Sequence, residues 1–268
     1  MTRHRPRKRF GQNFLVDETV IAAIVAAVAP QPRDVVVEIG PGLGALTRPL
    51  SARVVRLHVV EIDRDIVARL VTMFPRERVM VHEGDALEFD FAALGTGLGV
   101  VGNLPYNIST PLLFRLAGSV AAIRDIHVML QKEVVERMVA APSSSEYGRL
   151  SVMLQYRFRM ERIITVPAAA FRPVPKVESA VVRMIPFARP PHPARDEALL
   201  AKVVAAAFAQ RRKTLRNTLR GFIPAQELAA LGVDPGARGE TLSVEQFARI
   251  ANAVGDRTAA VAASNGAS

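Results

Sequence analysis

The stretch that decides the fold is Val36-Val37-Glu38-Ile39-Gly40-Pro41-Gly42-Leu43-Gly44. A β-branched run stops at a glycine-rich turn, and a helical pattern with Leu46 and Leu50 follows. Glycines at such a turn permit a tight backbone and a close approach to a ligand. The stretch predicts the first strand, turn and helix of a nucleotide-binding α/β domain. It leaves the ligand open, because Gly40-x-Gly42-x-x-Ala45 also fits the dinucleotide pattern.

Strand and helix signals alternate around this stretch through the first two-thirds of the chain. Strands are expected at residues 35–39, 54–62, 78–82, 100–101, 123–130, 163–166 and 179–185, and helices at 66–74, 111–117 and 132–140. A further helix covers residues 20–29, with a cap at Asp17, Glu18 or Thr19 and an end at Pro30. The alternation predicts an α/β class, with a Rossmann-like, mostly parallel sheet and helices on both faces.

The pattern of predicted elements changes at a proline-rich segment, residues 186–193. Only helical patterns follow it, at residues 197–219, 225–231 and 244–254, and the tail from Arg257 is expected to fray. We therefore predict one domain over residues 1–187 and a smaller, all-helical domain over residues 188–268.

Two further strand ends carry acids that suit a nucleotide. Glu61 follows the glycine turn by about 20 residues, where an acid reaches ribose hydroxyls. Asp85, after the third strand, could accept from an adenine amino group. Ribose and adenine occur in both nicotinamide cofactors and S-adenosylmethionine, so the choice stays open here. The alternative is that both acids are loop acids or helix caps.

The positive charge is concentrated in two short segments. The chain has 35 Lys and Arg against 25 Asp and Glu, a net charge of +10. Residues 1–9 and 203–220 hold ten of the basic residues and no acid. Such blocks indicate a polyanionic partner such as nucleic acid.

Other side chains narrow the chemistry. The chain has no cysteine, which excludes disulfides, thiolate zinc sites and a cysteine nucleophile. Its five histidines are scattered without the spacing of metal ligands, so no metal site is expected. No apolar run is long enough to span a membrane, which predicts a cytoplasmic protein.

The segment Gly102-Asn103-Leu104-Pro105-Tyr106-Asn107 follows the fourth strand. Taken alone, it could be an ordinary turn with a half-buried aromatic residue. Taken with other segments, it resembles the ribosomal RNA adenine dimethyltransferase family of the small-subunit, bacterial KsgA type. The matching segments are residues 7–15, 38–44, 61–63, 84–86, 102–109, 130–134, 147–151, 171–177 and 210–217.

This resemblance implies a reaction and a partner. The family uses S-adenosylmethionine to dimethylate the exocyclic amines of two adjacent adenosines. These lie in a hairpin loop near the 3′ end of 16S ribosomal RNA, within the assembling small subunit. The expected partner is therefore 16S ribosomal RNA in the immature 30S subunit. No membrane partner is expected, and the chain is expected to be a monomer.

The resemblance also assigns roles to residues. The side-chain oxygen of Asn103 and the carbonyl of Leu104 accept hydrogen bonds from the two N–H groups of the target amine. Pro105 restricts Leu104 to extended backbone angles. Tyr106 stacks on the adenine, and Phe171 is the opposing wall or, alternatively, a core aromatic residue. The implied cofactor residues are Asn13, Leu15, Gly40, Gly42, Glu61, Asp85 and Asn103. Phe14 is expected to pack in the core.

The basic blocks are the expected RNA-binding residues. Arg212, Arg216 and Arg220 recur every four residues, which predicts a basic ridge on a helix whose other face packs inward. A solvated ridge without a ligand is the alternative. The full set of expected RNA contacts is Arg7, Lys8, Arg9, Arg211, Arg212, Lys213, Arg216 and Arg220.

Rival functions remain at this point. The nearest is the 23S adenine methyltransferase of the macrolide-resistance type, which shares an Asn-x-Pro-Tyr motif; the segments 130–134 and 210–217 favour the small-subunit type. Another is an assembly factor that holds ribosomal RNA without catalysis. A nicotinamide dehydrogenase fits the glycine turn alone.

Overall fold

The computed structural model describes residues 12–265, and the side chains up to residue 260. The chain forms two compact units. The first comprises residues 1–136 and 159–186, and the second comprises residues 137–158 and 187–268. The division therefore differs from a single cut at residue 187, because residues 137–158 cluster with the second unit. No helix within residues 12–265 is both long and apolar enough to cross a membrane.

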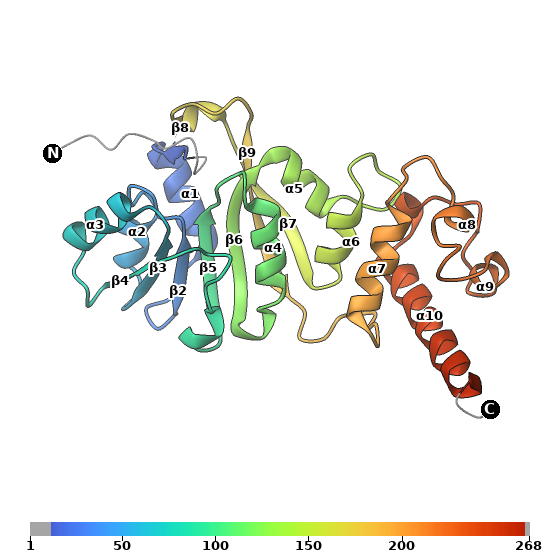
Figure 1. Ribbon diagram of the computed structural model, residues 1–268. Coiled ribbons are helices and arrows are strands. Elements are labelled where there is room, and N and C mark those ends of the chain that lie inside the picture. The colour runs from blue at the N-terminus through green and yellow to red at the C-terminus, as the bar shows by residue number, and fades with distance from the viewer. Residues whose placement is uncertain (1–11, 266–268) are drawn as a thin grey trace. The chain divides into compact units, whose positions relative to one another are not determined.

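A seven-stranded sheet forms the centre of the first unit, in the order β4-β3-β2-β5-β6-β9-β7 (Figure 1). Its strands are β2 (Val36–Ile39), β3 (Leu57–Glu61), β4 (Val79–Glu83), β5 (Leu98–Asn103), β6 (Ile123–Gln131), β7 (Phe158–Val166) and β9 (Ser179–Pro186). The pairs β3–β4, β2–β3, β2–β5 and β5–β6 are parallel, and β6–β9 is antiparallel. The prediction of a mostly parallel sheet is confirmed.

Helices cover both faces of this sheet. Every residue of β2 and β3 is buried, as expected for central strands with a helical layer on each side. The helices are α1 (Glu18–Val28), α2 (Thr47–Ser51), α3 (Arg64–Met73), α4 (Ser109–Ala117) and α5 (Lys132–Val139). Asp17 caps α1 by accepting from the N–H groups of Thr19 and Val20. The chain then leaves the helix through Ala29 in a left-handed conformation.

A second, two-stranded sheet was not predicted. It pairs β1 (Phe14–Leu15) with β8 (Phe171–Arg172), and Leu15 lies directly opposite Phe171. Directly opposed residues of an antiparallel pair point to the same face. Both side chains are buried in the core around β2 and β3. This short sheet therefore ties the amino-terminal segment to the segment before β9.

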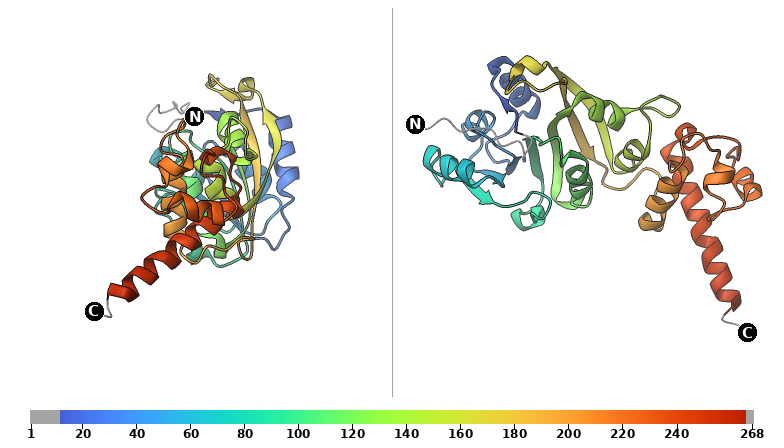
Figure 2. Two further views of the ribbon diagram at one scale, coloured as in Figure 1. Left: turned by 90° about the vertical axis from the view of Figure 1, so that its right-hand side faces the viewer. Right: turned by 45° about the horizontal axis from the view of Figure 1, so that its top comes forward.

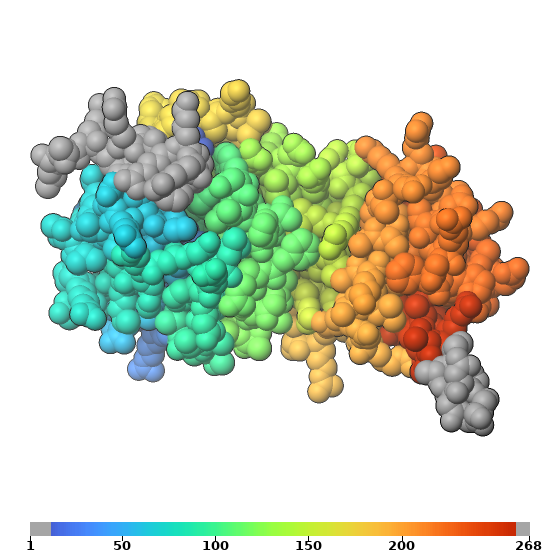
Figure 3. Space-filling model, in the orientation of Figure 1, coloured from blue at the N-terminus to red at the C-terminus, as the bar shows by residue number. Residues whose placement is uncertain are grey.

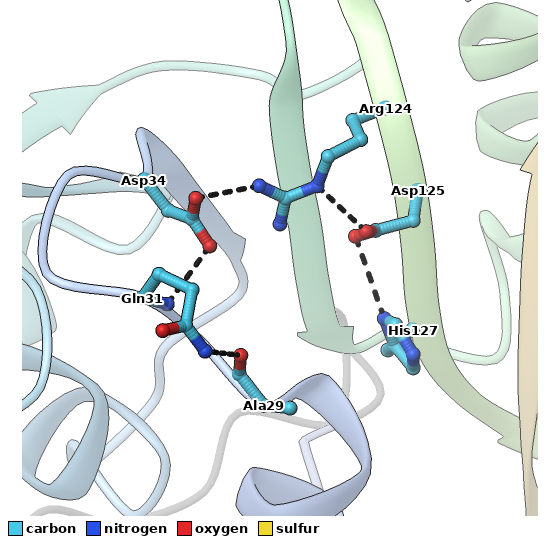
Figure 4. A network of polar contacts seen from close by, with 6 residues as sticks. All are labelled: Ala29, Gln31, Asp34, Arg124, Asp125 and His127. Atoms are coloured by element: carbon cyan, nitrogen blue, oxygen red, sulfur yellow. Dashed lines mark hydrogen bonds and ion pairs between the residues drawn. The ribbon is translucent and has the colours of Figure 1, made fainter.

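A polar network closes the edge of the main sheet where the parallel strands begin (Figure 4). The guanidinium of Arg124 contacts Asp34 at 2.7 Å and Asp125 at 2.8 Å. A Cβ atom on Gly99 would lie 3.1 Å from Nη2 of Arg124, so the glycine leaves room for the guanidinium above β5. The network joins the start of β2 to the start of β6, at the edge of the sheet opposite the carboxyl ends of its parallel strands.

The second unit is a helical cluster. It contains α6 (Arg149–Gln155), α7 (Glu197–Ala207), α8 (Leu215–Thr218), α9 (Ala225–Ala230) and α10 (Val244–Asn265). Apolar side chains of all these helices form its core, together with those of the loops between them. The hydroxyl of Tyr147 donates to the carbonyl of Leu242 at 2.8 Å within this core.

Two predictions for the second unit were wrong. The single helix expected at residues 197–219 is interrupted after Ala207, and α8 begins only at Leu215. The N–H of Leu215 instead bonds the carbonyl of Ala237 at 2.8 Å, so tertiary contacts replace the helical ones. The segment from Arg257 to Asn265, expected to fray, is the last part of α10 (Figure 2).

Candidate active site

A cavity of about 820 Å³ lies in the first unit, where the parallel strands end. Its lining comes from the amino-terminal segment, the glycine turn after β2, and the ends of β3, β4 and β5. The strand ends meet there because parallel strands point their carboxyl ends to one edge of the sheet. The predicted residues among its lining are Asn13, Leu15, Gly40, Gly42, Glu61, Asp85, Asn103, Leu104, Pro105 and Tyr106.

The glycine turn needs its glycines for two reasons. Gly40, Gly42 and Gly44 all have positive φ angles, of 66°, 53° and 88°. A Cβ atom on Gly42 would also lie 3.0 Å from the ring of Phe14. At its three glycines the turn therefore presents backbone without a side chain, which suits close contact with a ligand.

Two buried carboxyl groups face the cavity next to this turn. Glu61 accepts from the N–H of Asp63 at 2.9 Å, and burial raises its pKa although backbone N–H groups of Asp63, Gly42 and Ile62 oppose this. Burial also raises the pKa of Glu38 to about 8, despite a 2.7 Å hydrogen bond from Thr47. Sequence reasoning did not select Glu38. The sequence feature that could have pointed to Glu38 is an acid inside a β-branched run, because burying a charge there is costly without a functional or structural reason.

Asp85 has a local contact as well as its place on the cavity. Its Oδ1 accepts from the N–H of Leu87 at 2.9 Å, a turn contact that fits the alternative interpretation of Asp85 as a loop acid. A carboxylate has two oxygens and several acceptor positions, so this one hydrogen bond leaves others for a ligand. The geometry is compatible with both interpretations.

Asn103 ends β5 with its amide held in one orientation. Its Nδ2 donates to the main-chain carbonyl of Asn13 at 2.9 Å. Because the amide is planar, fixing the NH₂ group also fixes the direction of Oδ1, an acceptor. The next residue, Leu104, is tied by its N–H to the carbonyl of Met129 at 3.1 Å. The two consecutive acceptors that the family resemblance selects therefore sit on a restrained backbone.

A compact turn follows these acceptors. The hydroxyl of Ser109 donates to the carbonyl of Pro105 at 3.0 Å, which holds the turn against the start of α4. Tyr106 is half-buried, and its hydroxyl lies 2.7 Å from Oγ of Ser179. Burial raises the pKa of Tyr106, so the phenol stays protonated near neutral pH. An uncharged aromatic ring at the rim of the cavity suits stacking with a base.

Phe171 lies elsewhere. Its ring is fully buried and packs in the core with Leu15, and it is not among the residues that line the cavity. The pairing of β1 with β8 explains this position, because it directs both side chains inward. The structure thus shows Phe171 as a core aromatic residue, which was the alternative to an opposing wall for adenine. Phe14, expected in the core, packs against it and also borders the cavity.

The basic residues expected to contact RNA are placed in part. Arg7, Lys8 and Arg9 lie outside the described residues. The five cations of the other block, here named the basic segment, are all exposed on the second unit: Arg211, Arg212, Lys213, Arg216 and Arg220. Because the helix is interrupted, they lie on a loop and on α8 and its end rather than along one helical ridge. Figure 3 shows this part of the chain in orange.

A family model and a curated relative show the family of this chain, and solved structures show the same fold. The family model described as "Ribosomal RNA adenine dimethylase" matches residues 3–256. "Ribosomal RNA small subunit methyltransferase A" of Chromobacterium violaceum is 63% identical, over 97% of this chain and 99% of the relative. The structure of a dimethyladenosine transferase from Plasmodium falciparum aligns with a TM-score of 0.74 at 24% identity, over 88% of this chain and 95% of the other. That of the 23S rRNA methyltransferase ErmE aligns with a TM-score of 0.71 at 26% identity, over 90% and 99%.

Proposed function

Because the chain belongs to the ribosomal RNA adenine dimethylase family, we propose that it dimethylates two adjacent adenosines in a hairpin loop near the 3′ end of 16S ribosomal RNA. The chain is an rRNA adenine dimethyltransferase, and S-adenosylmethionine is its methyl donor. The observation that supports the proposed chemistry is the arrangement of Asn103, Leu104 and Tyr106 on the same cavity as the glycine turn and Glu61.

The lining residues suit this donor. Gly40, Gly42 and Gly44 offer backbone without side chains, and a Cβ on Gly42 would lie against the ring of Phe14. Glu61 is a buried acceptor for ribose hydroxyls, and Asp85 is an acceptor for the adenine amino group. Asn13 and Leu15 border the cavity from the amino-terminal segment. S-adenosylmethionine, when bound, supplies an electrophilic methyl group on a positively charged sulfur.

The protein's own contribution is to prepare the amine. The lone pair of an adenine amine is delocalised into the ring, which makes the nitrogen a weak nucleophile. Oδ1 of Asn103 and the carbonyl of Leu104 accept hydrogen bonds from its two N–H groups and so localise the lone pair on the nitrogen. Tyr106 stacks on the base and fixes its plane. No strong base is required, because the methylated amine loses its proton to water. Alignment with preorganised acceptors supplies most of the rate enhancement.

Recognition of the RNA is assigned to the basic segment. Five exposed cations on the second unit suit contacts with phosphates, which position the protein without reading sequence. The target adenine must leave the base stack to enter the cavity, so a loop or a flipped base is required. We place the reaction in the cytoplasm, on the immature 30S subunit, with the protein as a monomer.

A second candidate is methylation of 23S ribosomal RNA. The observation that favours it is the likeness to ErmE at 26% identity with a TM-score of 0.71. The relative from Chromobacterium violaceum, a small-subunit enzyme by name, is 63% identical over nearly the whole chain. The higher identity favours the small subunit.

The test is transfer of labelled methyl groups from S-adenosylmethionine to unmethylated small subunits, large subunits and naked 16S RNA, side by side. Dimethyladenosine on the small-subunit RNA alone would support the proposal. Label on the 23S RNA would favour the second candidate. Tight binding to small subunits with no label anywhere would indicate an assembly factor without catalysis.

A further inference from the structure

The hydroxyl of Tyr106 has one partner that the reaction described above does not use. It lies 2.7 Å from Oγ of Ser179, the first residue of β9. Ser179 is fully buried, whereas Tyr106 is half-buried. The contact joins positions 73 residues apart in the chain, so it is a tertiary restraint on the ring and not a local turn contact.

The position of Ser179 is itself fixed by the end of β6. Gln131 and Ser179 are direct partners in the antiparallel β6–β9 pair. The N–H of Lys132 donates to the carbonyl of Glu178 at 3.0 Å. The Nζ of Lys132 also contacts the carboxylate of Glu178 at 2.8 Å, an exposed ion pair that contributes little by itself. Residues 130–134, to which the mechanism gives no role, therefore hold the residue that touches Tyr106.

A tyrosine at the rim of a cavity needs more than its backbone to keep one ring orientation. The turn that begins at Pro105 fixes the Cα of Tyr106, but the side chain retains its own torsions. A hydrogen bond at the far end of the ring restrains them, because a buried hydroxyl that loses its partner is unsatisfied. The ring is then held at both ends, and its face has a defined position.

We propose that Ser179 is a positioning residue for methyl transfer, which holds the hydroxyl of Tyr106 and so fixes the ring face on which the target adenine stacks. This inference rests on the proposed function. Ser179 does not touch the adenine; it acts through Tyr106. If the hydroxyl of Ser179 served stability alone, its removal would lower the melting temperature without a selective effect on kinetics with the RNA substrate.

The experiment removes the same hydrogen bond from each side. Ser179→Ala, Tyr106→Phe and the double variant are compared with the wild type in kcat and KM for small subunits, in Kd for S-adenosylmethionine, and in melting temperature. Tyr106→Phe keeps the stacking ring and alters only a half-exposed position. It therefore still tests the hydrogen bond if Ser179→Ala fails to fold. Ser151→Ala is the matched control, because Ser151 is another fully buried serine, whose hydroxyl bonds the carbonyl of Arg137 in the second unit.

We expect each single variant to lower kcat/KM for the RNA roughly tenfold. The double variant should lose no more than either single variant, because both remove one interaction. The cofactor Kd should stay at the wild-type value, and Ser151→Ala should change the melting temperature alone. Additive losses, or wild-type kcat/KM in both single variants, would overturn the inference.

A second readout separates this inference from the proposed function. RNA with 2-aminopurine at the target position reports stacking on an aromatic ring through its fluorescence, without methyl transfer. If the wild type quenches this signal and both single variants quench it less, the role of Ser179 stands even where transfer fails. If the wild type methylates the RNA but the variants quench as it does, the inference alone fails.

Discussion

At the scale of single residues, the site depends on side chains that are oriented by main-chain groups. The amide of Asn103 is held by the carbonyl of Asn13, and the carboxyl of Glu61 is held by backbone N–H groups. Main-chain groups of strands and tight turns move little, so these side chains need little reorganisation when a substrate binds. Such preorganisation is the main source of electrostatic catalysis.

Replacement of Asn103 by alanine should abolish most of the methyl transfer. It removes one of the two proposed acceptors for the amine, and we expect kcat to fall about 100-fold or more, by analogy with the loss of one preorganised donor. Binding of small subunits should persist. Asn107→Ala is the matched control, because Asn107 is an exposed amide of the same turn that borders the cavity without a proposed acceptor role, and it should keep most activity. Equal loss of RNA binding and activity in Asn103→Ala would show that Asn103 is structural.

The buried carboxyl of Glu38 predicts a pH effect on stability. Burial raises its pKa from 4.5 to about 8 in the folded state. Between these values the folded protein keeps a proton that the unfolded chain releases, so stability falls as pH rises, by up to about 1.4 kcal/mol per pH unit. Glu38→Gln removes this dependence and keeps an acceptor for Thr47. Urea midpoints between pH 5.5 and 8.5 should therefore increasingly favour the variant. A constant difference between the two proteins would contradict the raised pKa.

At the scale of elements, the parallel strands were predictable and their exact partners were not. Runs such as residues 35–39 are β-branched and end at glycine, so the residue pattern and the glycine at its end suffice to predict a strand. The sheet of β1 and β8 has two residues in each strand, too few for any pattern. The interruption after Ala207 was missed because residues 208–214 have helical spacing, whereas contacts such as Leu215 with Ala237 decide the conformation.

The same limit applies to the site. Strand ends with Glu61, Asp85 and Asn103 were recognisable, because polar residues after apolar runs indicate one sheet edge. The buried position of Phe171 depends on a tertiary pairing with Leu15 that no local signal announces. The contact between Tyr106 and Ser179 likewise joins distant segments. The roles of the cavity residues stay predictions until the variants are measured.

The junction of β2 and β5 gives a prediction for this scale. Gly102 lies opposite Ile39, and a Cβ atom there would come within 2.5 Å of the carbonyl oxygen of Ile39. Since the obstacle is backbone, the strands must separate, and Gly102→Ala should destabilise the protein by about 1–3 kcal/mol. Denaturant unfolding measures this. Gly84→Ala, where nothing lies within 4 Å, should stay within about 0.5 kcal/mol of the wild type. Wild-type stability in Gly102→Ala would mean that the strands can move apart without cost.

At the scale of the whole molecule, the cavity and the basic segment proposed to contact RNA belong to different units. The cavity lies in the first unit, and the basic segment lies in the second. The net charge of +10 attracts any polyanion, so it cannot by itself select the small subunit. In the proposed function, phosphate contacts fix the register of the RNA, and the ability of an adenine to leave its stack and enter the cavity adds the selectivity.

Charge reversal in the basic segment tests this division. Arg212→Glu with Arg216→Glu should weaken binding to small subunits and lower the slope of log K against log salt by roughly one for each lost phosphate contact. The Kd for S-adenosylmethionine should not change, because both side chains belong to the second unit and the cavity lies in the first. Filter binding across a salt series gives the slope, and equilibrium dialysis gives the cofactor Kd.

The control for this pair is Lys202→Glu with Arg249→Glu. These two cations are also exposed on the second unit, on α7 and α10, and their reversal changes the net charge equally. If only the total charge mattered, both double variants would bind small subunits equally weakly, since the long-range field depends on total charge. Direct phosphate contacts would confine the loss of salt slope to the pair at 212 and 216. An unchanged slope in that pair would mean that the basic segment is only a solvated surface, and that the positive charge which holds the RNA lies elsewhere.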